Sequence, residues 1–266
     1  MTPGSDPRLL QGTNVTAVLA TLAFDAWAIA RAPNGVSTAE VLAVHPTLVT
    51  PPASALSIVG LVHAALLAFA LYQVRPSQGA RPYLREIGWR LAASAVLYVT
   101  WRVAFLHSYH RPALVPLTLV PIYGLVASLL AIYLRLRVGL AAVPRGEKLA
   151  VHAPFSLALG WATPVCMVNT ALVVRADVPG IPMSTQWGLT FVVLLALLGI
   201  GLGILRNRRD LAFALVVVWT TGSLAVARSG EPVIATAAAA VALLVAAAIP
   251  LVPVRRRQSF AACYLR

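Results

Sequence analysis

The sequence predicts an all-α, polytopic transmembrane helical bundle of about eight spans. Two features of the composition predict it: 59% of the 266 residues are hydrophobic, and only 11% are charged. A soluble domain carries about 25% charged residues, so a water-soluble chain of this composition would expose large apolar patches and aggregate. A third observation, the recurrence of apolar runs about 20 residues long, matches the thickness of a bilayer core. We therefore expect an integral membrane protein.

Eight apolar runs are candidate membrane-spanning helices. The short links between several of them, around residues 107–112, 206–209 and 229–231, predict antiparallel neighbours. The predicted spans are residues 13–31, 53–74, 88–107, 113–135, 150–174, 187–205, 210–228 and 232–252.

The basic residues predict the orientation of these spans. In an eight-span arrangement one side receives only Arg31, Arg111, Arg175 and Arg228, whereas the other receives most of the arginines. Lys and Arg collect in short cytoplasmic loops, so both termini should be cytoplasmic and the protein should lie in the cytoplasmic (inner) membrane. The residues assigned to the cytoplasmic side are Arg8, Arg75, Arg81, Arg85, Arg90, Arg135, Arg137, Arg145, Lys148, Arg206, Arg208, Arg209, Arg255, Arg256, Arg257 and Arg266.

This distribution explains the net charge of +13 without nucleic acid. We expect membrane lipids as partners, with some attraction to anionic headgroups, and no nucleic-acid partner. The first span could instead be a cleavable signal peptide, but Asp25 within its apolar stretch counts against cleavage. Cys166 and Cys263 stand far apart and predict neither a disulfide framework nor a metal site.

Two formal charges, Asp25 in the first span and Arg102 in the third, fall at similar predicted depths. An unpaired charge inside a membrane is costly, so we predict an intramembrane ion pair between them. The pair would act either as a clamp between two helices or as part of a ligand-binding or proton-handling site; alternatively, Arg102 extends its side chain to the outer interface. His63, near the middle of the second span, either ligates a pigment metal or, as is more common, hydrogen-bonds to a neighbouring helix.

The fifth span contains groups that fit poorly in hydrocarbon. Pro164 cannot donate a backbone hydrogen bond and should bend the helix near Gly160. Small residues at helical spacing, which include Ser156 and Gly160, predict close approach by another helix. Trp161 and Asn169 carry polar groups that need partners, so this helix either lines a cavity or lies in the bundle interior with its side chains satisfied.

The fifth span also carries a family resemblance. Residues 153–169, APFSLALGWATPVCMVN, resemble the fifth-helix signature of larger bacterial members of the tryptophan-rich sensory protein (translocator protein, TspO/MBR) family, a Pro-Phe-Ser, Gly-Trp and later Asn pattern. Residues 50–73, 87–107 and 216–222 resemble further family segments in the same order. The resemblance implies a five-helix membrane core over residues 1–175, three additional transmembrane helices over 176–254 and a basic cytoplasmic tail over 255–266.

Some positions depart from the family pattern. The second helix of the family usually carries Phe, Trp and Tyr, where this chain has Leu56, Val59 and His63, and Tyr98 replaces an asparagine of the third helix. The pocket therefore either holds a tetrapyrrole in an altered geometry, accepts another pigment near His63 or is filled by side chains. The ligand-binding residues that the resemblance implies are Trp161, Asn169, His63, Trp101 and Tyr98.

The resemblance implies a TspO-like protein that binds a hydrophobic small molecule, of tetrapyrrole or carotenoid type, in a sensory or regulatory role. No paired carboxylates, nucleophile with its base or metal motif occurs at membrane depth, so we expect no enzyme activity. The alternative is a non-catalytic accessory subunit of a larger photosynthetic or respiratory membrane complex, and a homodimer is a further possible assembly. A transporter would show related halves, and the sequence has no convincing internal repeat.

Overall fold

The computed structural model describes residues 6–44, 46–178 and 180–255. These residues form helices and connecting turns, with no strand among them. The predicted polytopic helical bundle is therefore confirmed. Apart from Arg255, the last residue of the final helix, the predicted basic tail lies outside the described residues.

Eight long helices occupy the eight predicted apolar ranges. Six of these helices lie in stretches that are long and apolar enough to cross a membrane. Of the other two, α5 carries Arg90 and Arg102, and α10 is 17 residues long. The eight helices are α1 (Pro7–Arg31), α3 (Ile58–Gln73), α5 (Arg90–His107), α6 (Leu119–Arg135), α8 (Ala153–Asp177), α9 (Met183–Arg208), α10 (Leu211–Ala227) and α11 (Pro232–Arg255).

Short helices and turns join the long ones. They include α2 (Thr38–Val44), α4 (Tyr83–Ile87) and α7 (Arg145–Glu147). The fourth span begins as two 3-10 turns, Pro112–Leu114 and Pro116–Thr118, and α6 proper starts only at Leu119. Proline lacks a backbone N–H and fits the first turn of a helix, so Pro112 and Pro116 each begin a short turn at the start of a span that continues to Arg135.

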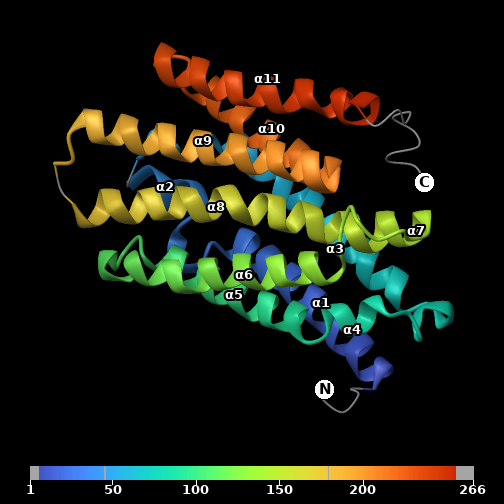
Figure 1. Ribbon diagram of the computed structural model, residues 1–266. Coiled ribbons are helices and arrows are strands. Elements are labelled where there is room, and N and C mark those ends of the chain that lie inside the picture. The colour runs from blue at the N-terminus through green and yellow to red at the C-terminus, as the bar shows by residue number, and fades with distance from the viewer. Residues whose placement is uncertain (1–5, 45, 179, 256–266) are drawn as a thin grey trace.

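Five of the helices form a closed ring. α1 packs against α5, α5 against α6, α6 against α8, α8 against α3, and α3 against α1. In Figure 1, α6 and α8 run side by side, and α1 and α5 lie along the lower face of the bundle. The side chains that point into this ring form its core and, as described below, enclose its cavities.

The other three long helices pack outside the ring through α8. α10 contacts α8 directly, and α9 and α11 pack on α10 (Figure 1). Gly160 lies at the α8–α10 contact, because a Cβ atom there would stand 3.2 Å from Val216 Cβ. Ser156, one turn earlier, donates a hydrogen bond of 2.6 Å to Asp210, the N-cap of α10. The small-residue face predicted for the fifth span is therefore the contact surface for α10.

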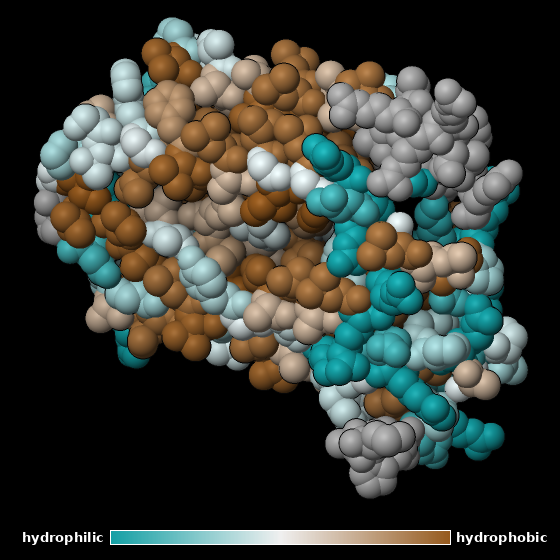
Figure 2. Space-filling model, in the orientation of Figure 1, coloured by the Kyte–Doolittle hydropathy of each residue, from teal (hydrophilic) through white to brown (hydrophobic). Residues whose placement is uncertain are grey.

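Polar and apolar residues occupy different parts of the molecular surface. Figure 2 shows hydrophilic residues gathered at the end of the bundle that carries α4 and α7, and hydrophobic residues over much of the remaining visible face. Apolar side chains such as Ile29, which is 80% exposed, have no protein neighbour to cover them. Together with the six stretches that are long and apolar enough to cross a membrane, these exposed apolar side chains indicate a multi-pass membrane protein whose surface contacts lipid.

The polar end is held by two ion pairs. Arg81, before α4, pairs with the buried carboxylate of Glu147 in α7, and this hydrogen-bonded carboxylate raises the pKa of Arg81. Arg135 at the end of α6 lies 3.7 Å from Glu86 in α4, and both of these side chains are largely exposed. These pairs tie the short helices of this end to α6 and to the start of α8.

Candidate ligand cavity

The structure contains a cavity with a volume of about 330 Å³. It lies between α1, α2, α3, α5 and α8, and its wall is completed by Pro51, Ala55 and Leu56 and by Thr220 of α10. All the site residues suggested by the sequence line it: Asp25, His63, Tyr98, Trp101, Arg102, Trp161 and Asn169.

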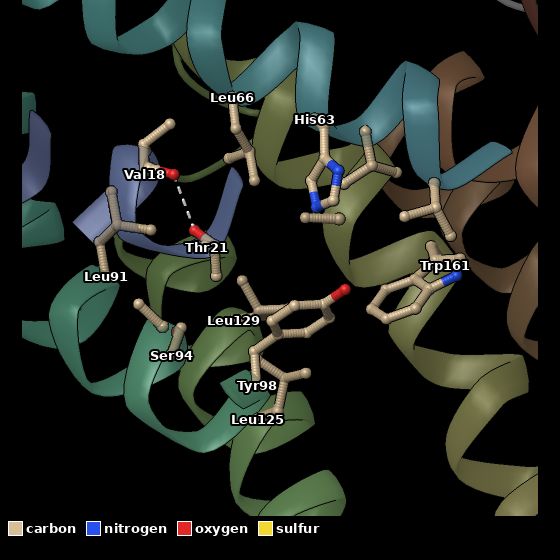
Figure 3. Close-up of a pocket in the computed structure, with 14 residues that line it drawn as sticks. Val18, Thr21, His63, Leu66, Leu91, Ser94, Tyr98, Leu125, Leu129 and Trp161 are labelled. Carbon is tan, nitrogen blue, oxygen red and sulfur yellow. Dashed lines mark hydrogen bonds between the residues drawn. The ribbon is translucent and has the colours of Figure 1, made fainter. Parts of the chain in front are cut away.

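A smaller cavity of about 50 Å³ continues into the ring interior. Its walls are mostly aliphatic and come from all five helices of the ring; Leu66, Leu91 and Leu129 are examples (Figure 3). Four residues line both cavities: Val59, His63, Tyr98 and Trp161. Their side chains therefore stand at the boundary between the ring interior and the larger cavity.

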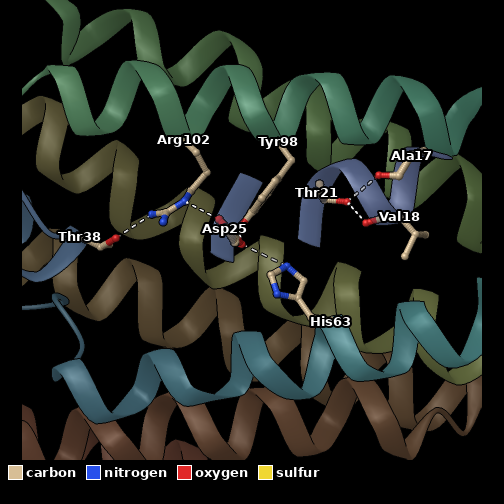
Figure 4. A network of polar contacts seen from close by, with 8 residues as sticks. All are labelled: Ala17, Val18, Thr21, Asp25, Thr38, His63, Tyr98 and Arg102. Atoms are coloured by element: carbon tan, nitrogen blue, oxygen red, sulfur yellow. Dashed lines mark hydrogen bonds and ion pairs between the residues drawn. The ribbon is translucent and has the colours of Figure 1, made fainter. Parts of the chain in front are cut away.

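Asp25 is the centre of a buried polar network (Figure 4). Its side chain is 7% exposed, and the Tyr98 hydroxyl donates a hydrogen bond to its Oδ2 atom. His63 Nε2 lies 3.2 Å from the same oxygen, and Arg102 Nε lies 3.3 Å from Oδ1. One carboxylate on α1 thus contacts side chains of α3 and α5.

The short helix α2 supplies a further partner for Arg102. Ser37 and Glu40 form a capping box at the start of α2: the Ser37 backbone N–H donates to Glu40 Oε2 at 2.6 Å, and the Glu40 N–H donates to Ser37 Oγ at 3.3 Å. The Ser37 hydroxyl and backbone N–H lower the pKa of Glu40. The cap fixes Thr38, whose hydroxyl accepts a hydrogen bond of 2.7 Å from Arg102 Nη1.

This network can hold charge at membrane depth. A buried charge is tolerated when it is paired and hydrogen-bonded, and the Asp25 carboxylate has three polar partners. Arg102 still has donor capacity, because its Nη2 makes no hydrogen bond to any described residue. The contact between His63 and Asp25 matches the expectation that a lone histidine joins a neighbouring helix.

A second polar chain fixes the aromatic wall of the cavity. Trp101 Nε1 donates to Asn169 Oδ1 at 3.1 Å, and Asn169 Nδ2 donates to the Thr118 hydroxyl at 2.7 Å. The Trp101 and Trp161 rings meet edge to face, with centroids 6.1 Å apart, a favourable arrangement for aromatic pairs. Asn169 therefore joins α5, α8 and the turn before α6.

Trp161 differs from Trp101 in its hydrogen bonding. Its side chain packs against Tyr98 and Trp101, but its indole N–H has no hydrogen-bond partner among the described residues. The residue is 9% exposed and lines both cavities. The Trp161 nitrogen is not among the fully enclosed atoms that have no partner, so this donor is open to a molecule in the cavity.

Sequence reasoning missed several residues of the site. Thr38 and Thr118 complete the two polar chains, and Pro51, Ala55 and Thr220 close the cavity. The S-T-A-E capping box was a readable signal for the helix that carries Thr38. Nothing in the sequence pattern indicated that Thr220, from a helix outside the ring, would reach the cavity.

The described residues contain no cluster of three or more His, Cys, Asp or Glu side chains placed to hold a metal ion. The larger cavity instead presents aromatic and aliphatic walls, one buried ionic network and an unpaired indole donor. This combination of a mostly apolar concave surface with a few fixed polar groups is typical of small-molecule sites.

Comparison with known proteins identifies the family. Residues 11–251 match the family described as TSPO-like protein, a range that extends from α1 to α11. No match was found among curated proteins or solved structures. Because the family match covers most of the chain, this protein belongs to the TSPO-like protein family.

Proposed function

We propose that this TSPO-like membrane protein binds a hydrophobic small molecule of the tetrapyrrole type in the 330 Å³ cavity, in a sensory or regulatory role and without catalysis. The observation that carries the proposal is the unpaired Trp161 indole N–H in a cavity whose walls are mostly aromatic and aliphatic and which also holds the Asp25 network. The family membership is consistent with this reading.

The dimensions and chemistry of the cavity support this ligand class. Its volume falls at the low end of the roughly 300–1,000 Å³ typical of small-molecule sites. The Trp101 and Trp161 rings offer aromatic surface on which a flat macrocycle can stack. Trp161 Nε1 and Arg102 Nη2 are available donors for acceptor groups such as the carboxylates of a tetrapyrrole.

The proposal includes a domain division and an orientation. The ring of α1, α3, α5, α6 and α8 is the ligand-binding core over residues 1–175, and α9 to α11 are its extension. We assign the basic end, where α4 and α7 lie, to the cytoplasmic side of the inner membrane, because short cytoplasmic loops are enriched in Lys and Arg. The packing of the five ring helices around the cavities supports this division.

Titration with protoporphyrin IX tests the proposal. We expect saturable quenching of tryptophan fluorescence in the purified protein, together with a shift of the porphyrin absorption band. Trp161→Phe keeps an aromatic ring but removes the N–H donor. A hydrogen bond contributes about 0.5–1.5 kcal/mol, so the dissociation constant should rise about 2- to 10-fold.

Trp187→Phe is the matched control, because Trp187 lies near the start of α9 and does not line the cavity. This variant should bind as tightly as the unmodified protein. The absence of saturable binding in the unmodified protein would contradict the proposal. If stoichiometric partner proteins then co-purified in mild detergent, the accessory-subunit alternative would be favoured instead.

A further inference from the structure

The segment between α2 and α3 covers part of the cavity. Pro51 and residues 55–56 of this segment line the cavity wall, and the chain then turns directly into α3. Two consecutive prolines, Pro51 and Pro52, have no backbone N–H to donate. The cover, defined here as residues 47–57, has hydrogen bonds within its two halves, from Thr50 to Thr47 and from Ala55 to Pro52. Contacts from α10 attach these two halves to the rest of the molecule.

Arg228, at the end of α10, supplies such contacts. Its Nε donates to the Leu48 carbonyl at 3.0 Å, and its Nη2 donates to the Thr47 carbonyl at 2.5 Å and to the Thr50 carbonyl at 3.3 Å. One guanidinium thus holds three carbonyls of a single turn. Hydrogen bonds from a charged donor are stronger than neutral ones, so this is the main polar attachment of the turn.

Trp219 holds the other half of the cover. Its indole Nε1 donates a hydrogen bond of 3.2 Å to the carbonyl of Ala55, a residue that itself lines the cavity. The neighbouring residue of α10, Thr220, lines the cavity directly. Side chains of α10, a helix outside the five-helix ring, therefore reach both ends of the cover and the cavity between them.

We propose that Arg228 and Trp219 are positioning residues that fasten the cover over the cavity, so that α10 controls how fast a ligand enters and leaves. The control of ligand exchange rests on the proposed function, whereas the fastening does not. Neither residue lines the cavity, so each acts through the backbone carbonyls it holds rather than by touching the ligand.

Hydrogen exchange in the ligand-free protein tests the fastening. The amides of Thr50 and Ala55 are the probes, since each donates a hydrogen bond within the cover, to the Thr47 and Pro52 carbonyls respectively. Arg228→Gln and Trp219→Phe should each speed exchange at the amides nearest to the lost contact by about tenfold or more. Arg228→Lys, which keeps the charge but loses the planar fork, should give an intermediate rate.

Arg111→Gln is the matched control, because Arg111 is exposed at the same end of the bundle and its side chain makes no hydrogen bond or ion pair to a described residue. It should leave exchange in the cover unchanged. Unchanged exchange in both Arg228→Gln and Trp219→Phe would overturn the fastening. Trp219→Phe retains an aromatic ring on α10, so it still decides the question if Arg228→Gln fails to fold.

Ligand kinetics test the second half of the proposal. In protein loaded with protoporphyrin IX, both variants should release the porphyrin at least fivefold faster than Arg111→Gln does. Equal release rates combined with faster amide exchange would overturn the control of ligand exchange. If the unmodified protein binds no porphyrin, the proposed function fails, but the exchange experiment still decides whether α10 holds the cover.

Discussion

At the scale of single residues, the Asp25 network is the most unusual feature of the chain. A carboxylate and a guanidinium are buried together at membrane depth, and each has hydrogen bonds besides their mutual contact. Burial of two charges is rarely a net gain in stability, but removal of one partner leaves the other buried without a counter-charge, which is strongly destabilising. The network should therefore tolerate loss of both charges better than loss of one.

Asp25→Asn tests this asymmetry. The substitution keeps the shape of the side chain but leaves Arg102 without its carboxylate. Breaking a buried pair costs about 3–5 kcal/mol, so we expect a loss of roughly that size in unfolding experiments in mixed detergent micelles. The double variant Asp25→Asn with Arg102→Gln should recover part of the loss.

An exposed pair provides the control. Glu86 and Arg135 are 43% and 51% exposed and lie 3.7 Å apart. Exposed pairs contribute about 0–1 kcal/mol, so Glu86→Gln should change the unfolding free energy by less than about 1 kcal/mol. Equal effects of Asp25→Asn and Glu86→Gln would mean that the buried network does not stabilise the fold.

Sequence reasoning reached some residues of the site and not others. The cost of an unpaired intramembrane charge pointed to Asp25 and Arg102, and the family resemblance pointed to Trp161 and Asn169. The partner of Asn169, Thr118, could not be found this way, since a threonine in a proline-rich turn has no pattern that marks it. Such partners depend on how distant helices pack, which local sequence does not encode.

At the scale of helices, the presence and approximate bounds of each helix could be predicted from the length of the apolar runs. The packing partners of each helix could not be predicted. The small face of the fifth span predicted close packing, yet only the structure identifies α10 as its partner, through the contact of Gly160 with Val216. The glycines of α9 also look alike in the sequence but differ in their packing. A Cβ atom added at Gly201 would lie 3.3 Å from Val245 and 3.5 Å from Val217, whereas one added at Gly203 would meet nothing within 4 Å.

Gly160→Leu tests the α8–α10 contact. Even a Cβ atom at this position would lie 3.2 Å from Val216 Cβ and 3.4 Å from Phe213 Cα, so a larger side chain must push the two helices apart. Overpacking costs about 1–3 kcal/mol, and we expect a correspondingly lower midpoint of thermal unfolding in detergent. Gly203→Leu should leave the midpoint nearly unchanged, and equal midpoints for the two variants would contradict the tight contact.

At the scale of the whole molecule, the basic residues gather at one end of the helical bundle. The arginines that the sequence assigned to one side are far apart along the chain, but the alternating helices bring α4, α7 and the end of α9 to the same end of the bundle (Figures 1 and 2). The opposite end carries α2 and the cover of the cavity. With the basic end in the cytoplasm, the cavity lies toward the outer face.

Thiol labelling in intact cells tests this orientation. In a background with Cys166→Ala and Cys263→Ala, Ser77→Cys places a thiol at the basic end, and Ser229→Cys places one between α10 and α11 at the opposite end; both serines are exposed. A membrane-impermeant maleimide should label Ser229→Cys in intact cells, but Ser77→Cys only after permeabilisation. The reverse pattern would mean that the basic loops are translocated against the positive-inside rule. The cavity and the cover that α10 holds would then face the cytoplasm, and a ligand would have to reach them from that side.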